Sequence, residues 1–117
     1  MRLIVALVCS IGIASQYSPG VMQQVVRNRQ AIGQLQNVSG IDGFAAVSDC
    51  ARIGDRITID DRPFMISDCA GDDATRLWMR NVLVEVDYET ALRYQAVGRG
   101  FTVKVCEQSV RRTYTPE

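Results

Sequence analysis

Histidine is absent from this sequence of 117 residues. Its absence excludes Ser-His-Asp and Cys-His catalysis in their usual form, together with histidine-based zinc motifs. Any acid–base chemistry would then have to use carboxyl groups. The four cysteines contain no C-x-x-C pair, which also excludes a zinc ribbon and a thioredoxin-like redox site. We therefore expect neither a metal nor a cofactor.

A surplus of either charge is also missing, because thirteen basic residues balance thirteen acidic ones. Proteins that bind nucleic acid or anionic membranes usually carry clustered positive charge, so we expect no nucleic-acid partner. The length and the 47% hydrophobic content are typical of one globular domain. We expect this domain to be a monomer.

One apolar run opens the chain. Arg2 supplies a positive charge, and residues 3–14 are almost all apolar or small. This pattern is typical of a secretory signal peptide over residues 1–15, and the run is short for a membrane span. We predict a mature domain over residues 16–117 that is secreted or extracytoplasmic, in the periplasm or cell wall, without a stable membrane anchor. In that case the leader should make few contacts with the domain; the alternative is that it forms a buried first strand.

The tetrapeptide Ser-Asp-Cys-Ala occurs twice, nineteen positions apart. Cys50 and Cys69 hold the same place in the two copies, so equivalent strands should bring them within reach of a disulfide. Removal of the leader would also remove Cys9 and leave three cysteines in an oxidising compartment. We therefore predict a bond between Cys50 and Cys69, and a free thiol at Cys106.

Short apolar runs bounded by Gly, Asp and Pro dominate the rest of the chain. Such regularly spaced runs are typical of strands in a small barrel or sandwich. Apolar residues at helical spacing predict a helix over 21–30, and the polar, glycine-containing stretch after it predicts a surface loop. We expect strands at 44–48, 56–60, 63–67, 82–87 and 101–106, a hairpin turn at 60–63, and short helices at 72–79 and 89–94.

Four segments resemble double-psi β-barrel families, in particular the rare lipoprotein A, 3D-domain and expansin/barwin group. Their order and spacing over residues 44–106 are similar to the strands, glycine turns and acidic strand ends of these families. The resemblance implies a mainly β fold, a small six-stranded double-psi β-barrel with one or two short helices and two halves related by a pseudo-two-fold axis. The segments are 45–47 leading to 53–59, 66–71, 84–88 with Ala91, and 98–105.

The same resemblance implies a site. Members of these families cleave glycans, as lytic transglycosylases or endoglucanases, through Asp residues in a groove, whereas other members only bind polysaccharide. Carried over to this chain, the implied catalytic residues are Asp68, which precedes a glycine turn, and Asp87, which follows the later strand. We further expect substrate-binding roles for Asp49, near this groove, and for the aromatic residues Trp78 and Tyr88, beside the carboxyl groups.

Three functions are open at this point. The first is a secreted protein that acts on peptidoglycan, in which a carboxyl group with a raised pKa protonates the leaving oxygen. The second is a noncatalytic carbohydrate-binding module, because rare lipoprotein A proteins place a His where this chain has Ser48 and Asp49. The third is a structural module associated with the wall or with a phage, in which the Asp residues only form turns.

Overall fold

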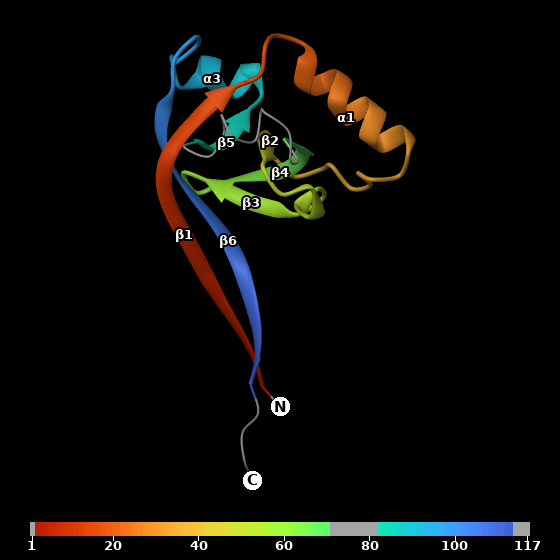
Figure 1. Ribbon diagram of the computed structural model, residues 1–117, viewed down its shortest axis with the longest axis vertical. Coiled ribbons are helices and arrows are strands. Elements are labelled where there is room, and N and C mark those ends of the chain that lie inside the picture. The colour runs from red at the N-terminus through yellow and green to blue at the C-terminus, as the bar shows by residue number, and fades with distance from the viewer. Residues whose placement is uncertain (1, 71–81, 114–117) are drawn as a thin grey trace.

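The computed structural model describes residues 2–70 and 82–113, which form a closed β-barrel of six strands. Around the barrel the strands follow the order β1-β5-β2-β4-β3-β6 (Figure 1). The prediction of a mainly β fold with a small six-stranded barrel and one or two short helices is confirmed. The strands are β1 (Arg2–Gln16), β2 (Gly43–Val47), β3 (Arg56–Ile59), β4 (Arg62–Cys69), β5 (Val82–Val86) and β6 (Phe101–Thr113).

Two α-helices of the described chain lie outside the barrel: α1 (Val21–Ala31) and α3 (Tyr88–Arg93). They correspond closely to the helices expected at 21–30 and 89–94. The helix expected at 72–79 lies outside the described residues. Within residues 2–70 and 82–113, no helix has the length and apolar character needed to cross a membrane.

The barrel interior is filled by apolar side chains from all six strands. Successive side chains of a strand point to opposite faces, so residues two apart share the core. Val84 and Val86 of β5 follow this rule and are buried, whereas Glu85 between them belongs to the outer face. The core residues are Ala14, Ala45, Val47, Ile57, Ile59, Phe64, Ile66, Val84, Val86 and Val103.

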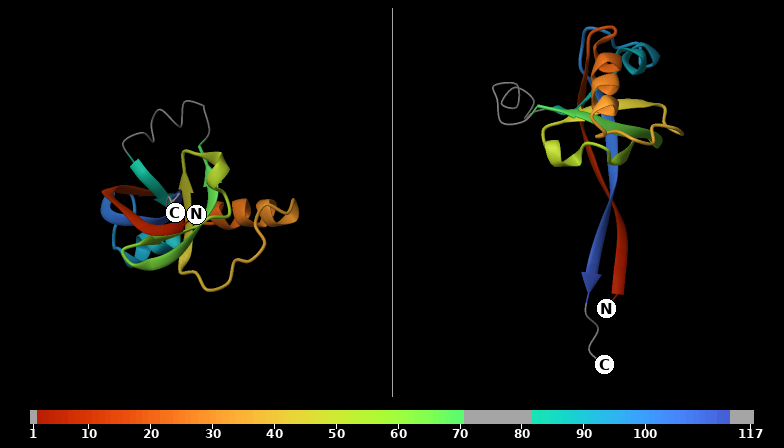
Figure 2. Two further views of the ribbon diagram at one scale, coloured as in Figure 1. Left: turned by 90° about the horizontal axis from the view of Figure 1, so that it is seen from below. Right: turned by 90° about the vertical axis from the view of Figure 1, so that its right-hand side faces the viewer.

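A second apolar cluster lies outside the barrel wall, between α1 and β4. Met22 and Val26 on one face of α1 pack with Leu35 from the following loop and with Met65 of β4. Because Met65 alternates with the inward-facing Ile66, β4 is buried on both faces, which explains its continuous apolar run. Figure 2 shows α1 lying along one side of the barrel, where the candidate site is found.

The turn between β3 and β4 confirms the predicted hairpin. Ile59 pairs with Arg62, which leaves a two-residue loop of Asp60 and Asp61. Both loop residues have positive φ, 49° and 68°, as the favoured two-residue hairpin turns require. Asp tolerates this backbone conformation better than most residues, so the Asp-Asp pair sets the register of the two strands.

Strand β1 is the main departure from the sequence prediction. It pairs antiparallel with β6 from Arg2 opposite Thr113 to Ala14 opposite Phe101. Its end also pairs parallel with β5 over residues 13–16. The expectation that the leader makes few contacts is therefore wrong. Its removal as a signal peptide stays a prediction.

Only the end of β1 belongs to the barrel wall. Before Cys9, β1 and its partner β6 leave the barrel as a two-stranded ribbon that carries both ends of the described chain away from it (Figure 1). Val5 is 60% and Leu7 67% exposed in this ribbon, whereas Ala14 in the wall is fully buried. The side chains of Val5 and Leu7 are thus mostly exposed rather than packed against other described residues.

The pairing of β1 with β6 corrects one cysteine prediction and leaves the other intact. Cys9 lies opposite Cys106 and is joined to it by a disulfide, so Cys106 is not a free thiol. The two strands come from opposite ends of the chain, and their pairing leaves no trace in local sequence. The predicted bond between Cys50 and Cys69 is confirmed, with a Cα–Cα distance of 5.0 Å.

Shortening β1 tests which of its residues the barrel needs in order to fold. A chain without residues 2–10 should fold, because it keeps the pairing of residues 13–16 with β5 and the buried Ala14. A chain without residues 2–14 should lose cooperative thermal unfolding, since β5 and β6 would face an open seam with unpaired backbone groups. Circular dichroism melts check this, with Cys106→Ala in both chains because each lacks Cys9.

The matched control for the lost disulfide is the unshortened chain with Cys9→Ala and Cys106→Ala. In the chain-entropy model a disulfide that closes a loop of about 100 residues contributes about 4.7 kcal/mol to the free energy of unfolding. Equal melts for the two shortened chains would contradict the assignment of residues 13–16 to the barrel wall. Mass spectrometry of secreted protein tests the signal peptide separately. A mature chain that still begins at Met1 would refute cleavage.

Candidate functional site

A disulfide fixes the end of β4. Strands β2 and β4 run parallel, so their carboxyl ends meet, with Val47 opposite Cys69. After β2, the 3-10 turn η1 (Cys50–Arg52) begins with Cys50, which is bonded to Cys69. A bond across nineteen residues contributes about 3 kcal/mol in the chain-entropy model. The residue directly before Cys69 is Asp68, which is thereby held in place.

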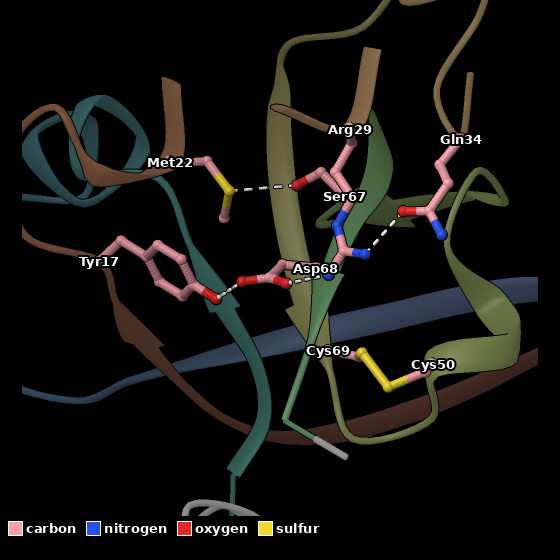
Figure 3. Close-up of polar contacts among 8 residues, drawn as sticks. All are labelled: Tyr17, Met22, Arg29, Gln34, Cys50, Ser67, Asp68 and Cys69. Carbon is pink, nitrogen blue, oxygen red and sulfur yellow. Dashed lines mark hydrogen bonds and ion pairs between the residues drawn. A yellow bond between two sulfur atoms is a disulfide. The ribbon is translucent and has the colours of Figure 1, made fainter. Parts of the chain in front are cut away.

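Asp68 accepts hydrogen bonds from two other elements (Figure 3). The hydroxyl of Tyr17, just after β1, donates to Oδ2 over 2.6 Å. Nη2 of Arg29, on α1, donates to Oδ1 over 2.8 Å and forms an ion pair whose side chains are only 24% and 17% exposed. Oε1 of Gln34 accepts from Arg29 Nη1 over 2.6 Å and orients the guanidinium. Both oxygens of Asp68 are therefore bonded in a partly desolvated setting.

Tyr17 acts in this arrangement as a fixed donor. Its backbone N–H donates to the carbonyl of Val86 over 2.8 Å, which holds the residue against β5. Burial raises the pKa of the Tyr17 hydroxyl well above its ordinary value, and the hydrogen bond to Asp68 raises this pKa further. The hydroxyl thus keeps its proton and its hydrogen bond at all physiological pH values.

A second carboxyl group lies across β2 from Asp68. Ala46 pairs with Asp68 on one side and with Glu85 on the other. Burial raises the pKa of the half-buried Glu85 above its ordinary value, and the negative charge of Asp68 adds to the shift. We call Tyr17, Arg29, Asp68 and Glu85 the Asp68 cluster. It combines an ion-paired carboxylate with a carboxyl group that resists ionisation, the two kinds that acid–base chemistry requires.

Asp87 does not join the Asp68 cluster. It follows β5, is 7% exposed, and accepts on Oδ1 from the N–H of Phe44 at 3.2 Å and from the hydroxyl of Thr90 at 2.8 Å. These bonds tie the start of β2 to α3. In the described chain no hydrogen bond or ion pair joins Asp87 to Asp68. The structure therefore groups Asp68 with Glu85 rather than with Asp87.

Of the substrate-binding candidates in the described chain, neither Asp49 nor Tyr88 forms a hydrogen bond or ion pair with Asp68. Asp49 is exposed and caps η1, where its Oδ1 accepts from the N–H of Ala51 over 2.9 Å. Tyr88 is the first residue of α3 and is half-buried, and none of the hydrogen bonds between described residues involves its hydroxyl. Trp78 lies outside the described residues. Asp49 thus forms a turn, which is the role that the third of the three functions above gives to the Asp residues.

Sequence reasoning misses three members of the cluster. Tyr17 stands in a Tyr-Ser-Pro-Gly turn, and Arg29 follows the apolar stripe of a helix, so neither attracts notice. Glu85 did leave a signal, since it is a charged residue between two valines in a strand-like run. Only the tertiary structure brings residues 17 and 29 to residue 68.

Among residues 2–70 and 82–113, no group of three or more Cys, Asp or Glu side chains could hold a metal ion. Comparisons of the chain with protein-family models, with curated proteins and with solved structures found no match. Function is therefore inferred from the Asp68 cluster and from the sequence resemblance.

Replacement of Glu85 by Gln should stabilise the protein at neutral pH. A raised pKa means that the folded state binds this proton more tightly than the unfolded state, so its stabilisation is complete below the unfolded pKa of about 4.3 and is lost as pH rises through the folded pKa. Gln keeps the shape and stays neutral. Calorimetric Tm values should therefore show a gain that grows from about pH 4 to about pH 7.

The matched control for this experiment is Glu89→Gln, which removes an exposed carboxylate at the start of α3. Its Tm difference from the parent should not grow in the same way. A Glu85→Gln gain that is no larger at pH 7 than at pH 4 would contradict a raised pKa for Glu85.

Proposed function

We propose that this protein acts on cell-wall glycan outside the cytoplasm, with the Asp68 cluster as its centre. The observation that carries the proposal is a half-buried carboxyl group with a raised pKa, Glu85, beside the ion-paired Asp68. A general acid needs a pKa raised toward the working pH. The resemblance to double-psi β-barrel families supports the same class of substrate, and a closed six-stranded barrel is compatible with it.

The proposed reaction is that of a lytic transglycosylase, which needs one acid. The carboxyl group of Glu85 donates its proton to the glycosidic oxygen while the bond from that oxygen to the sugar C1 breaks. A hydroxyl group of the same sugar attacks C1 and returns its proton to the Glu85 carboxylate. Asp68, whose charge is held in place by Arg29 and Tyr17, stabilises the positive charge that develops on the sugar.

The disulfides support an extracytoplasmic location, because such bonds persist in oxidising compartments. The bond between Cys50 and Cys69 would remain after removal of residues 1–15, whereas the bond from Cys9 would be lost with them. The substrate proposed for this location is peptidoglycan or a related polysaccharide.

Noncatalytic binding is the second candidate, and a separate observation favours it. Both oxygens of Asp68 are already bonded, and Asp87 is used in tying β2 to α3. In this case Arg29 donates to sugar hydroxyls and Glu85 accepts from or donates to them, without bond cleavage.

Purified cell-wall sacculi distinguish these functions. Glu85→Gln should lower the release of soluble fragments by about 100-fold or more, because it removes the proton donor. Asp68→Asn should lower both this release and the amount of protein that sediments with sacculi. Mass spectrometry of the fragments should find sugar ends closed by their own hydroxyl rather than ends that have added water.

The matched control is Asp61→Asn, an equal change of charge at a side chain 79% exposed on the β3–β4 turn. If the protein only binds glycan, no fragments appear, yet Asp68→Asn still weakens sedimentation. Asp87→Asn tests the role implied by the resemblance, since an equal loss there with intact folding would move the centre to Asp87. Unchanged sedimentation and no release in any variant would end the glycan proposal.

A further inference from the structure

A cavity of about 440 Å³ lies between α1, the loop that leads into β2, and α3. Its lining combines apolar side chains from α1 and that loop with charged groups near α3. Tyr17, Arg29, Asp68 and Glu85 are not part of it, so the cavity is separate from the Asp68 cluster. The lining residues are Met22, Gln23, Val38, Ile41, Asp42, Gly43, Phe44, Asp87, Glu89 and Arg93.

Asp87 presents one oxygen to this cavity. Its side chain is more than nine-tenths buried, and Oδ1 accepts from both Phe44 and Thr90. Oδ2 accepts no hydrogen bond from any residue in the described parts of the chain. Oδ2 is not among the fully buried, unpartnered side-chain atoms of the described residues. Since Asp87 lines the cavity, a donor from a ligand in the cavity can reach this oxygen.

Gly43 makes this placement of Asp87 possible. A Cβ atom at residue 43 would lie 2.6 Å from Oδ1 of Asp87 and 2.8 Å from Oγ1 of Thr90. Any other residue would therefore displace the carboxylate from its donors. The absence of a side chain at residue 43 thus leaves room for the Asp87 carboxylate at the cavity wall.

The other charged side chains of the lining each have a hydrogen-bond or ion-pair partner in the protein. Asp42 pairs with Arg62 at 3.3 Å, and Glu89 accepts from Gln23 over 2.8 Å. Nη2 of Arg93 donates to the carbonyl oxygen of Asp42 and to the hydroxyl of Thr90. Asp87 is thus the buried carboxylate of the lining, and no ion pair between described residues involves it.

We propose that this cavity binds an aliphatic primary ammonium group, such as the side chain of a lysyl residue in a peptide. The ammonium donates to Oδ2 of Asp87, and a hydrogen bond between two charged groups is roughly twice as strong as one between neutral groups. The methylene stem lies on the apolar side chains of Met22, Val38 and Ile41, as the stems of long cationic side chains do elsewhere. Asp87 is then a ligand-binding residue, independent of the glycan chemistry at Asp68.

An NMR titration of the ¹⁵N-labelled protein tests the proposal, with n-pentylammonium chloride as the probe and n-pentanol as its neutral counterpart. The amide of Phe44 donates to Asp87 and reports directly on that carboxylate. We expect saturable shifts of this amide with n-pentylammonium and an affinity about tenfold or more above that for n-pentanol. Equal affinities, or no saturable shift with the amine, would overturn the proposal.

Variants separate the ammonium contact from general packing. Asp87→Asn keeps the shape and should weaken n-pentylammonium binding by about tenfold or more, whereas the control Asp61→Asn should leave it unchanged. Val38→Trp fills the cavity from the loop, leaves Asp87 in place, and should abolish binding. If Asp87→Asn fails to fold, Val38→Trp and the comparison with n-pentanol decide the matter. Unchanged affinity in Val38→Trp or in folded Asp87→Asn would refute the site, and Glu85→Gln should not affect it.

Discussion

The partly buried negative charge of Asp68 is the constraint on which the arrangement of this protein depends. A carboxylate in this position needs donors, since its desolvation is costly when it is left unpaired. The donors come from the residue after β1 and from α1, two elements that are far from β4 in sequence. The disulfide from Cys69 to Cys50 holds the carboxylate at the strand end. The carboxylate of Asp68 thus connects three parts of the fold: the end of β1, the helix α1 outside the barrel, and the end of β4 beside β2.

The carboxyl groups on this side of the barrel have different surroundings and therefore different capacities. Asp68 has an ion pair and a tyrosine donor, while burial and a negative neighbour raise the pKa of Glu85. Asp87 has two neutral donors on one oxygen and an open cavity at the other. Proton donation, charge stabilisation and ligand binding are thereby proposed for three separate residues rather than for a single pair of aspartates.

Strand β1 combines two properties that sequence analysis treats as alternatives. Its first part carries exposed apolar side chains, and its last part supplies the buried Ala14 and closes the barrel against β5. Hydrophobicity alone does not distinguish these parts, because both read as one apolar run. The partner strands decide the matter, and β6 lies at the other end of the chain. The same long-range pairing joins Cys9 to Cys106.

The sequence by itself determined the elements that depend on local patterns: the strands β2 to β5, helix α1, the Asp-Asp hairpin, and the pairing of Cys50 with Cys69 through an internal repeat. Periodicity, turn chemistry and repeat spacing are properties of neighbouring residues, so they can be read directly. Only the tertiary structure decided that Glu85 rather than Asp87 lies level with Asp68 across β2, and that Tyr17 and Arg29 donate hydrogen bonds to Asp68. The reason is physical: the register across β2, with its shift after Ala45, sets which side chains meet, and register is fixed by packing of whole strands.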